Sequence, residues 1–436
     1  MKSKFTLAVI LFFLIFPGVV YAQDLSSIDS GDTAWLLIST ALVMLMIPGL
    51  ALFYGGMVRR KNVLSTLMQC FVIMCVVGLQ WILWGYSLAF GPDKWGIIGG
   101  LEWLGLNSVG LSPSPDYAST VPHQAFMIFQ GMFAAITPAL IIGAFAERMK
   151  FSTLLIFTLL WTTLVYDPVC HWVWGTGGWL GKLGVLDFAG GIVVHLSSGI
   201  AALIAALMMG KRRGYLHEPM PPHNLPMTVL GAALLWFGWF GFNAGSSLSS
   251  GALAVSAFVV TNTAAVAAAL TWAIIEWRHR GNPTVLGIVT GAVAGLATIT
   301  PASGFVGPMS AIVIGIAAGV FCYIAVSVIK PKLGYDDSLD VFGVHGIGGI
   351  WGVLAVGLFA STAINPDGVN GLFFGNPAQI GIQAIGIVAV LLYSLVVTWV
   401  ILKILDVLLG LRVSVKDEIM GLDLSQHSES GYTILE

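Results

Sequence analysis

Charged residues are scarce in this sequence. Lys, Arg, Asp and Glu make up 9% of the 436 residues, while 57% are hydrophobic. Soluble domains are usually about 25% charged. Apolar runs of membrane-spanning length recur from end to end, and the charges fall in the short gaps between them. The sequence therefore predicts an all-α polytopic membrane protein. A membrane β-barrel would show short alternating strands instead.

Cysteine is also rare, and none of it has the spacing of a metal site. Each of the four cysteines lies inside an apolar run, so we interpret them as small buried hydrophobic residues: Cys70, Cys75, Cys170 and Cys322. The net charge is −2, and no basic tract is long enough to bind nucleic acid. We expect no metal, no other cofactor and no nucleic-acid partner.

Residues 1–22 have the pattern of a cleavable signal peptide. Lys2 and Lys4 precede the apolar stretch Phe5–Phe16, and the segment ends in Val-Tyr-Ala. The alternative is an uncleaved first transmembrane helix. Cleavage would place the mature N-terminus near Gln23 outside the membrane, most simply in a bacterial periplasm.

Eleven candidate spans follow within a transmembrane domain at 23–410, and residues 411–436 form a tail. Their lengths bracket the roughly 20 residues that cross about 30 Å of hydrocarbon. The spans are predicted at 34–57, 63–90, 124–146, 152–174, 189–209, 226–244, 252–276, 284–300, 309–329, 341–361 and 379–409.

The cationic residues of the loops predict the orientation of the chain. Twelve Lys and Arg residues follow spans one, three, five, seven and nine, whereas the intervening loops contain only Lys94 and Lys182. Cationic loops stay on the cytoplasmic side. We therefore expect a plasma-membrane protein, the inner membrane in a bacterium, with its N-terminus outside and its tail in the cytoplasm.

An odd number of spans in each half inverts the second half relative to the first. The two five-helix repeats are expected at about 30–210 and 225–362, followed by one last helix at 379–409. Inverted repeats are typical of transporters, whose substrate sites lie near the midplane at the repeat interface.

Each half carries one histidine inside an apolar run. His195 follows Asp187 in the run Asp-Phe-Ala-Gly-Gly-Ile-Val-Val-His, and His345 follows Asp340 in Asp-Val-Phe-Gly-Val-His. An ionisable side chain at this depth is costly and marks a transport or relay site. If span five begins near Asp187, then His195 lies about 12 Å into the membrane, close to the midplane.

Other interpretations of these residues remain open. A membrane histidine can instead form a structural hydrogen bond to a neighbouring helix. A metal site would need three or four ligands, which the sequence does not supply beside either histidine. Asp187 can be a helix N-cap, an acid that attracts a cation to the outer mouth, or both. Asp167 is a further acid near the outer end of span four.

Aromatic residues form a second group near the outer end of the bundle. The group comprises Phe129, Phe133, Trp174, Trp236, Phe237, Trp239, Phe240 and Phe242, with Ser246 close by in the sequence. Aromatic stripes in membrane helices usually serve packing. Aromatic faces also attract small cations, and deeper phenylalanines can form a constriction that removes water.

Several motifs resemble the Amt/Mep/Rh ammonium transporter family, and its bacterial Amt branch most closely. They are Asp-Phe-Ala-Gly-Gly-x-Val-Val-His at 187–195, Trp-Phe-Gly-Phe-Asn-Ala-Gly-Ser at 239–246 and Asp-Val-Phe-Gly-Val-His-Gly at 340–346. The resemblance covers essentially all of residues 30–425. It implies a homotrimer with one pore per subunit and a tail that works with PII-type signalling proteins.

The resemblance also implies roles for individual residues. Trp174 and Ser246 resemble the outer ammonium-recruitment site, with Phe133 nearby and Thr300 in the vestibule. Phe133 and Phe242 resemble a phenylalanine gate, and His195 and His345 the twin pore histidines. Asp187 resembles the essential acid at the head of the pore. The Asp167-Pro168 pair departs from the family pattern, in which an apolar residue precedes this proline.

The expected function is ammonium transport. Ammonium is recruited outside, loses its proton near the gate and passes the histidines as ammonia, with net movement of charge. The alternatives are an electroneutral ammonia channel and an ammonium-sensing receptor that acts through its tail. An enzyme is not expected, since no nucleophile–base pair or metal set is present.

Overall fold

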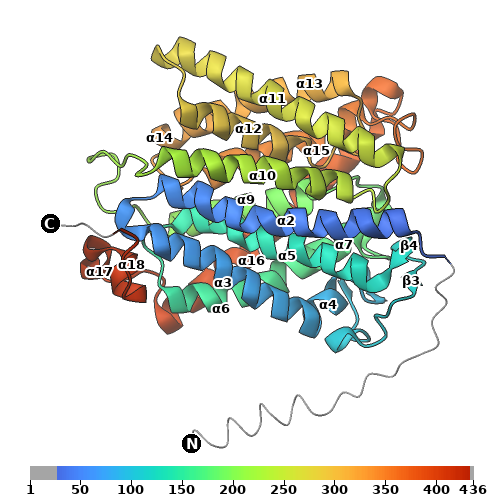
Figure 1. Cartoon of the computed structure of the whole chain (residues 1–436), viewed down its shortest axis with the longest axis horizontal. Helices are drawn as coiled ribbons and strands as arrows, with labels where there is room; N and C mark the ends of the chain where they lie inside the picture. Colours follow the sequence, from blue (N-terminus) through green and yellow to red (C-terminus); the bar gives the residue numbers. More distant parts are fainter. Residues whose placement is uncertain (1–26, 433–436) are drawn as a thin grey trace, which may run out of the picture.

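The computed structural model describes residues 27–432, so the predicted signal peptide at 1–22 lies outside the described residues. Long helices run side by side through the molecule (Figure 1). In the described part, ten helical segments are long and apolar enough to cross a membrane. The prediction of an all-α polytopic membrane protein is thus confirmed.

The spans follow one another in the predicted order, and several are built from two or three consecutive helical pieces. The pieces are α2 (Ser30–Met57); α3 (Val63–Gln80), η2 (Trp81–Gly85) and α4 (Tyr86–Phe90); α5 (His123–Phe145); α6 (Phe151–Trp161), η4 (Thr162–Tyr166) and α7 (Asp167–Trp174); η5 (Gly191–Leu196) and α9 (Ser197–Met209); α10 (Leu225–Gly245); α11 (Ala252–Arg280); α12 (Val285–Ile299); α13 (Pro308–Ile324), η6 (Ala325–Ile329) and α14 (Lys330–Leu333); η7 (Phe342–Gly346) and α15 (Ile347–Phe359); and α16 (Ala378–Leu409).

The eighth predicted span is a helix, but a short one. Helix α12 has 15 residues and is followed by turns from Thr300 onward. At 1.5 Å per residue it covers roughly 22 Å, less than the hydrocarbon core. Most of its residues are buried, and a Cβ atom on Gly295 would lie 2.6 Å from the Ala264 carbonyl oxygen of α11. This close packing surrounds the short helix with protein.

Shorter elements occupy the two ends of the bundle. One end carries η3 (Leu104–Leu106), α8 (Trp179–Leu183), η8 (Leu372–Phe374) and two small antiparallel hairpins, β1 (Asp93–Lys94) with β2 (Ile98–Gly99) and β3 (Pro113–Ser114) with β4 (Ala118–Pro122). The short helix η1 (Arg60–Asn62) lies beside the tail. The tail forms α17 (Val415–Met420) and α18 (Leu422–His427), which lie at the end opposite β3 and β4 (Figure 1).

Spans one to five and six to ten pack in the same pattern. In each half the first span contacts the third, the second contacts the third and fourth, and the third contacts the fifth. The halves meet where α2 lies beside α10, and where α9 contacts η7 while α15 contacts η5 (Figure 1). These matched contacts support the two predicted five-helix repeats.

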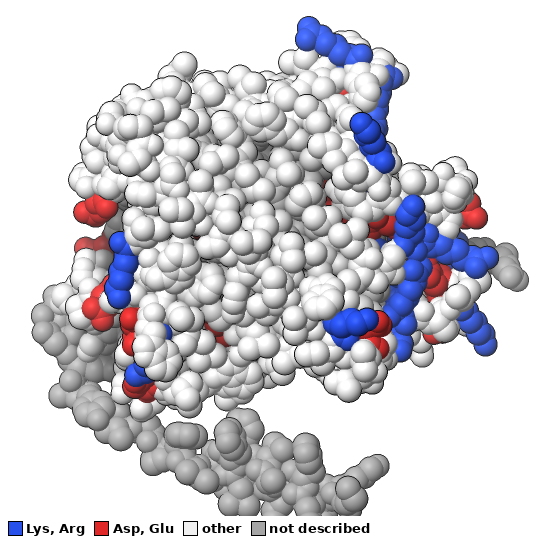
Figure 2. All heavy atoms as spheres, turned by 180° about the vertical axis from the view of Figure 1, so that it is seen from behind, with Lys and Arg blue, Asp and Glu red and all other residues white. Residues whose placement is uncertain are grey.

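The Lys and Arg residues gather at one end of the molecule. Figure 2 shows them at the right, with a nearly uncharged middle and only a few charges at the left. We call the end that carries α17 and α18 the basic end, and the opposite end the far end. The uncharged band between them fits a surface that faces lipid.

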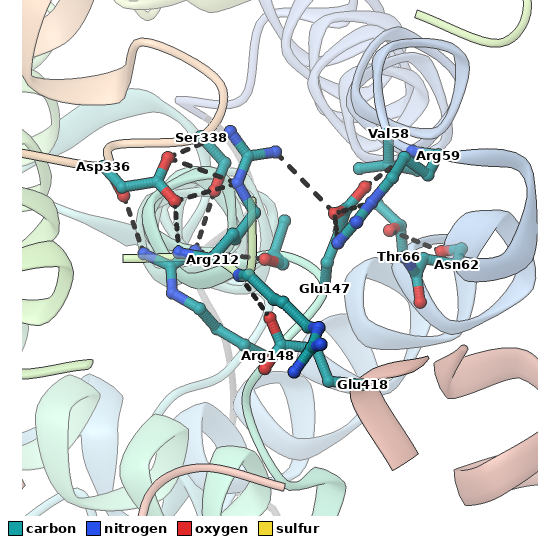
Figure 3. Close-up of polar contacts among 12 residues, drawn as sticks. Val58, Arg59, Asn62, Thr66, Glu147, Arg148, Arg212, Asp336, Ser338 and Glu418 are labelled. Carbon is teal, nitrogen blue, oxygen red and sulfur yellow. Dashed lines mark hydrogen bonds and ion pairs between the residues drawn. The ribbon is translucent and has the colours of Figure 1, made fainter. Parts of the chain in front are cut away.

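A buried polar network joins the loops at the basic end (Figure 3). Arg212 donates to both carboxylate oxygens of Asp336, at 2.9 and 3.0 Å. The Arg59 Nε atom lies 2.6 Å from the Glu147 Oε2 atom, and Arg148 donates to the Asp336 carbonyl oxygen at 2.7 Å. The loops after spans one, three, five and nine are therefore tied together.

Candidate functional site

Asp187 caps the fifth span from inside the molecule. Its carboxylate accepts hydrogen bonds from four successive amides, those of Gly190, Gly191, Ile192 and Val193, at 2.6 to 3.2 Å. A carboxylate has about four acceptor positions. All four acceptor positions of Asp187 are used here. Asp187 therefore has the geometry of a helix N-cap that orients η5.

Glycine is required at the start of η5. Gly190 has a φ of +112°, a left-handed conformation that glycine adopts without strain. At Gly191, a Cβ atom would lie 2.4 Å from the Pro301 ring. The Gly-Gly pair therefore lets the chain turn sharply below Asp187 and lets η5 approach the segment after α12.

The tenth span is capped by Asp337, not by Asp340. The Asp337 carboxylate accepts from the Phe342 amide at 2.8 Å. Asp337 precedes His345 by eight residues, the same interval as from Asp187 to His195. Asp340 has a φ of +63° and corresponds to Gly190. Asp337, and not the Asp340 of the sequence motif, therefore occupies the position of Asp187, and the eight-residue spacing could have revealed it.

Asp340 instead forms an ion pair with Lys330, while Asp337 has no cation bonded to its carboxylate in the described chain. Burial raises the pKa of Asp337 to about 6, against the opposing charge of Lys330. Its Oδ1 atom has no hydrogen-bond partner among residues 27–432. The Asp337 carboxylate thus accepts fewer backbone hydrogen bonds than the Asp187 carboxylate does.

The two predicted pore histidines lie together in the interior. The Nδ1 atoms of His195 and His345 are 3.2 Å apart, and their rings are stacked with centroids separated by 5.1 Å. One Nδ1 atom must donate and the other accept, so the rings hold opposite tautomers. One Nε2 atom is then a donor and the other an acceptor.

A row of aromatic rings leads from the far end to the histidines. Trp174 is 6.0 Å from Phe133, Phe133 is 4.2 Å from Phe242, and Phe242 is 6.0 Å from His195, measured between ring centroids. Phe133 and Phe242 are buried, and Trp174 is partly exposed. The two predicted gate residues are therefore in contact directly beside the histidine pair.

The predicted recruitment residues flank this row. Trp174 donates to the Asp187 carbonyl oxygen at 2.8 Å, and Ser246 donates to the Phe242 carbonyl oxygen at 2.9 Å. Both side chains are partly exposed. Trp174 is thus held by the backbone of Asp187, and Ser246 by the backbone of the predicted gate residue Phe242.

Thr300 is the residue predicted for the vestibule. It is fully buried, donates to the Leu296 carbonyl oxygen and accepts from the Trp239 indole at 2.9 Å. The Trp239 ring stacks on His195 with centroids 5.5 Å apart. Thr300 therefore orients the ring that supports His195, and its hydroxyl faces the interior.

A chain of cavities that widens toward the basic end begins at the histidines. The first is lined by both histidines, Trp239, Phe242 and aliphatic side chains. The second shares Phe53, Val293 and His345 with it and reaches Asp340. The third shares Thr290 and Asp340 with the second and is lined by Glu276 and Lys330. The path thus becomes charged only beyond His345.

No group of three or more His, Cys, Asp or Glu side chains that could hold a metal ion occurs within residues 27–432. The cysteines described there are all free thiols. The His195 ring lies between the imidazole of His345 and the indole ring of Trp239.

Comparison with known proteins decides the family. The model of the Ammonium Transporter Family matches residues 34–432. The chain belongs to this family. The expectations of a transporter rather than an enzyme, with ammonium as substrate, are thereby confirmed at the level of the family, and the chain is a multi-pass membrane protein.

Several ammonium transporters resemble the chain along most of their length. The ammonium transporter of Bacillus subtilis is 53% identical over 402 residues, which cover 92% of this chain and 98% of that protein. Ammonium transporter Amt1 of Archaeoglobus fulgidus is 50% identical over 93% of this chain and all of its own length. The crystal structure of Saccharomyces cerevisiae Mep2 has a TM-score of 0.85 at 39% identity and covers 89% of both chains.

Proposed function

We propose that the chain recruits ammonium at the far end, removes one proton there and conducts ammonia past His195 and His345 to the basic end. The observation that carries this proposal is the unbroken row of Trp174, Phe133, Phe242 and the two histidines. The row begins at a partly exposed tryptophan and ends in cavities that reach Asp340.

The apolar lining of the path favours a neutral solute. An unpaired ion in an apolar interior costs tens of kcal/mol by its solvation alone. Between Phe242 and Asp340, the cavities are lined by aliphatic and aromatic side chains, Thr290 and the histidines. Ammonia can donate to one histidine Nε2 atom and accept from the other, whereas a desolvated ammonium ion meets no carboxylate there.

The recruitment step needs a group that attracts a cation. The face of Trp174 supplies one, since aromatic faces bind cations within about 6 Å of the ring centroid. The buried gate of Phe133 and Phe242 then separates the recruited ion from the histidines. We propose that the proton is released at this gate and crosses by a separate route, so that transport moves net charge.

The test is the current across a solid-supported membrane that carries proteoliposomes, recorded when ammonium replaces sodium. We expect a saturable transient current that His195→Ala abolishes. His217→Ala is the matched control, because His217 is exposed in a loop, and it should keep the current. Equal currents in wild type and His195→Ala would contradict the role of the histidine.

The same recording separates the alternatives. Rapid internal alkalinisation without current would identify an electroneutral ammonia channel, which the uncharged lining also permits. If neither the current nor the alkalinisation were observed, a receptor that acts through its tail would be favoured. Normal flux but lost nitrogen regulation after deletion of residues 412–436 would be separate support for the receptor.

We also propose the placement and partners of the protein. The far end faces the outside and the basic end the cytoplasm of a bacterial inner membrane, because cationic loops remain inside. Apolar side chains such as Phe237, Phe258 and Leu270 are exposed on α10 and α11, and they would pack in a homotrimer or against lipid. Chemical cross-linking in native membranes tests the trimer.

A PII-type protein is proposed to bind the basic end beside the tail. Pull-down with and without residues 412–436 would test this binding.

A further inference from the structure

Asp167 is a fully buried acid that the conduction path does not use. It is the first residue of α7, directly after η4 in the fourth span. Its partner is Gln80, the last residue of α3 directly before η2 in the second span. The Gln80 Nε2 atom donates to the Asp167 Oδ2 atom at 2.7 Å. Both residues therefore sit at π-helical segments, which frequently mark functional sites.

The surrounding side chains hold the Gln80 amide in place. Thr163 accepts from the Gln80 Nε2 atom at 3.3 Å and from the Trp84 indole at 3.0 Å. Gly85 leaves room for the amide, since a Cβ atom there would lie 2.5 Å from the Gln80 Oε1 atom. The amide is thus fixed against its own helix and aimed at Asp167.

Two buried oxygens of this pair lack partners. The Oδ1 atom of Asp167 and the Oε1 atom of Gln80 have no hydrogen-bond partner in the part of the chain that the structure describes. Within residues 27–432, no Lys, Arg or His forms an ion pair with Asp167. Tyr166 and Cys170 are its titratable neighbours on the same span, and neither is cationic. An ionised Asp167 would be an uncompensated charge inside the membrane.

One proton added to Asp167 would give both oxygens a hydrogen-bond partner. We propose that Asp167 is a proton-binding site in which the protonated carboxyl and the Gln80 amide form a two-hydrogen-bond ring. The amide N–H donates to Oδ2, as observed, and the carboxyl O–H on Oδ1 donates to the Gln80 Oε1 atom. A metal cation fits less well, because hard cations such as Ca²⁺ take six or more oxygen ligands and the pair offers two.

This inference does not rest on the proposed transport mechanism. The site lies between spans two and four, and none of its residues lines the cavities that begin at the histidines. Asp167 is nevertheless part of the same helix, α7, whose last residue, Trp174, contacts Phe133 of the proposed gate.

The test is infrared spectroscopy of the purified protein at neutral pH in water and in deuterium oxide. We expect a carbonyl band of a protonated carboxylic acid that shifts on deuteration and is lost in Asp167→Asn. The control Asp367→Asn removes an exposed loop carboxylate and should keep the band. In Gln80→Leu the band should move to higher frequency, because its hydrogen-bond partner is gone. A spectrum unchanged by Asp167→Asn would overturn the proposal.

Thermal unfolding provides a second measurement that does not depend on the infrared band. Asn has the shape of a protonated Asp and can form the same ring, so Asp167→Asn should unfold at the wild-type temperature, whereas Asp167→Leu should unfold at a lower one. If Asp167 instead bound a cation, sodium or ammonium would raise the unfolding temperature of wild type but not of Asp167→Asn. That result would also overturn the proposal.

Discussion

At the scale of single residues, His195 is held in place through two other side chains. Its ring stacks on Trp239, and the indole N–H of Trp239 is fixed by the Thr300 hydroxyl. His345 lies on the other side of His195. The orientation of His195 thus depends on a threonine that lines neither of the cavities beside the histidines.

Replacing Thr300 by valine should therefore weaken both stability and transport. The substitution leaves the buried Trp239 N–H without an acceptor, which costs about 1–3 kcal/mol. Thr298→Val is the matched control, because the Thr298 hydroxyl is buried near the same helix end and has no partner among the described residues. Unfolding temperature and ammonium current should fall in Thr300→Val and remain near wild type in Thr298→Val. Equal losses in the two variants would contradict this role.

Asp337 should produce a pH-dependent contribution to stability. Its folded pKa is about 6 because of burial, while an unfolded aspartate titrates near about 3.9. The folded chain therefore binds this proton more tightly, so the stabilisation is complete below about pH 4 and is lost as the pH rises to about 6. The unfolding temperature of wild type relative to Asp337→Asn should fall over this interval and stay constant above it. If the difference in unfolding temperature between wild type and Asp337→Asn did not change with pH, the pKa of Asp337 would be the same in the folded and unfolded chain.

At the scale of elements, the tail supplies a cap that the second span lacks. Asn62 at the N-terminus of α3 makes no side-chain cap, and the Asp423 carboxylate of α18 instead accepts from the Leu64 and Ser65 amides at 3.1 and 2.8 Å. The Asn62 side chain accepts from the Leu422 amide in return. The start of α3 and the tail are therefore one structural unit.

Asp423→Ala should release this unit. Loss of a helix cap costs about 0.5–2 kcal/mol, and here it also removes a contact of the tail. We expect faster hydrogen exchange at the Leu64 and Ser65 amides and faster proteolysis between α16 and α18. Asp417→Ala is the control, since Asp417 is bonded to Ser414 within the tail itself and not to α3. Unchanged exchange at α3 would mean that another group caps it.

Much of the element structure could be predicted from the sequence, because apolar length and flanking charge decide where a helix enters and leaves a membrane. The predicted span 124–146 is α5, His123–Phe145, and the predicted 379–409 is α16, Ala378–Leu409. The predicted span 284–300 is α12, Val285–Ile299, so its shortness was already present in the sequence prediction. The cap of α3 by Asp423 depends on a contact between segments more than 350 residues apart, which periodicity does not encode.

The site shows the same division. His195, His345, Phe133 and Phe242 could be predicted because polar or aromatic residues stand out in an apolar run and because their motifs resemble a known family. The bond of Thr300 to Trp239 and the cap by Asp337 were not predicted, since sequence position does not tell which way a hydroxyl faces or which of two nearby acids caps a helix. Asp167 was noted as an acid, but its partner Gln80 is 87 residues away.

At the scale of the whole molecule, charge separation and the repeat determine the arrangement together. Because each half has an odd number of spans, the second half is inverted. The second span of the second half, α11, therefore ends at the same end of the molecule as the third span of the first half, α5, and the loops after both carry cationic residues. Ion pairs such as Arg212 with Asp336 then tie loops of both repeats at that end (Figure 3). The histidine contact between the repeats therefore lies between an anchored basic end and the far end that carries the hairpins.

The orientation can be tested with the lysines that the chain already has. Lys94 and Lys182 are at the far end, with side chains 44% and 66% exposed, whereas Lys211 and Lys332 are exposed at the basic end. If cationic loops face the cytoplasm, a membrane-impermeant amine reagent should modify only the far-end lysines in right-side-out vesicles. Inverted vesicles should show the opposite, and detergent should expose both sets. Labelling of Lys211 before that of Lys182 in right-side-out vesicles would reverse the orientation, and ammonium would then be recruited from the cytoplasm.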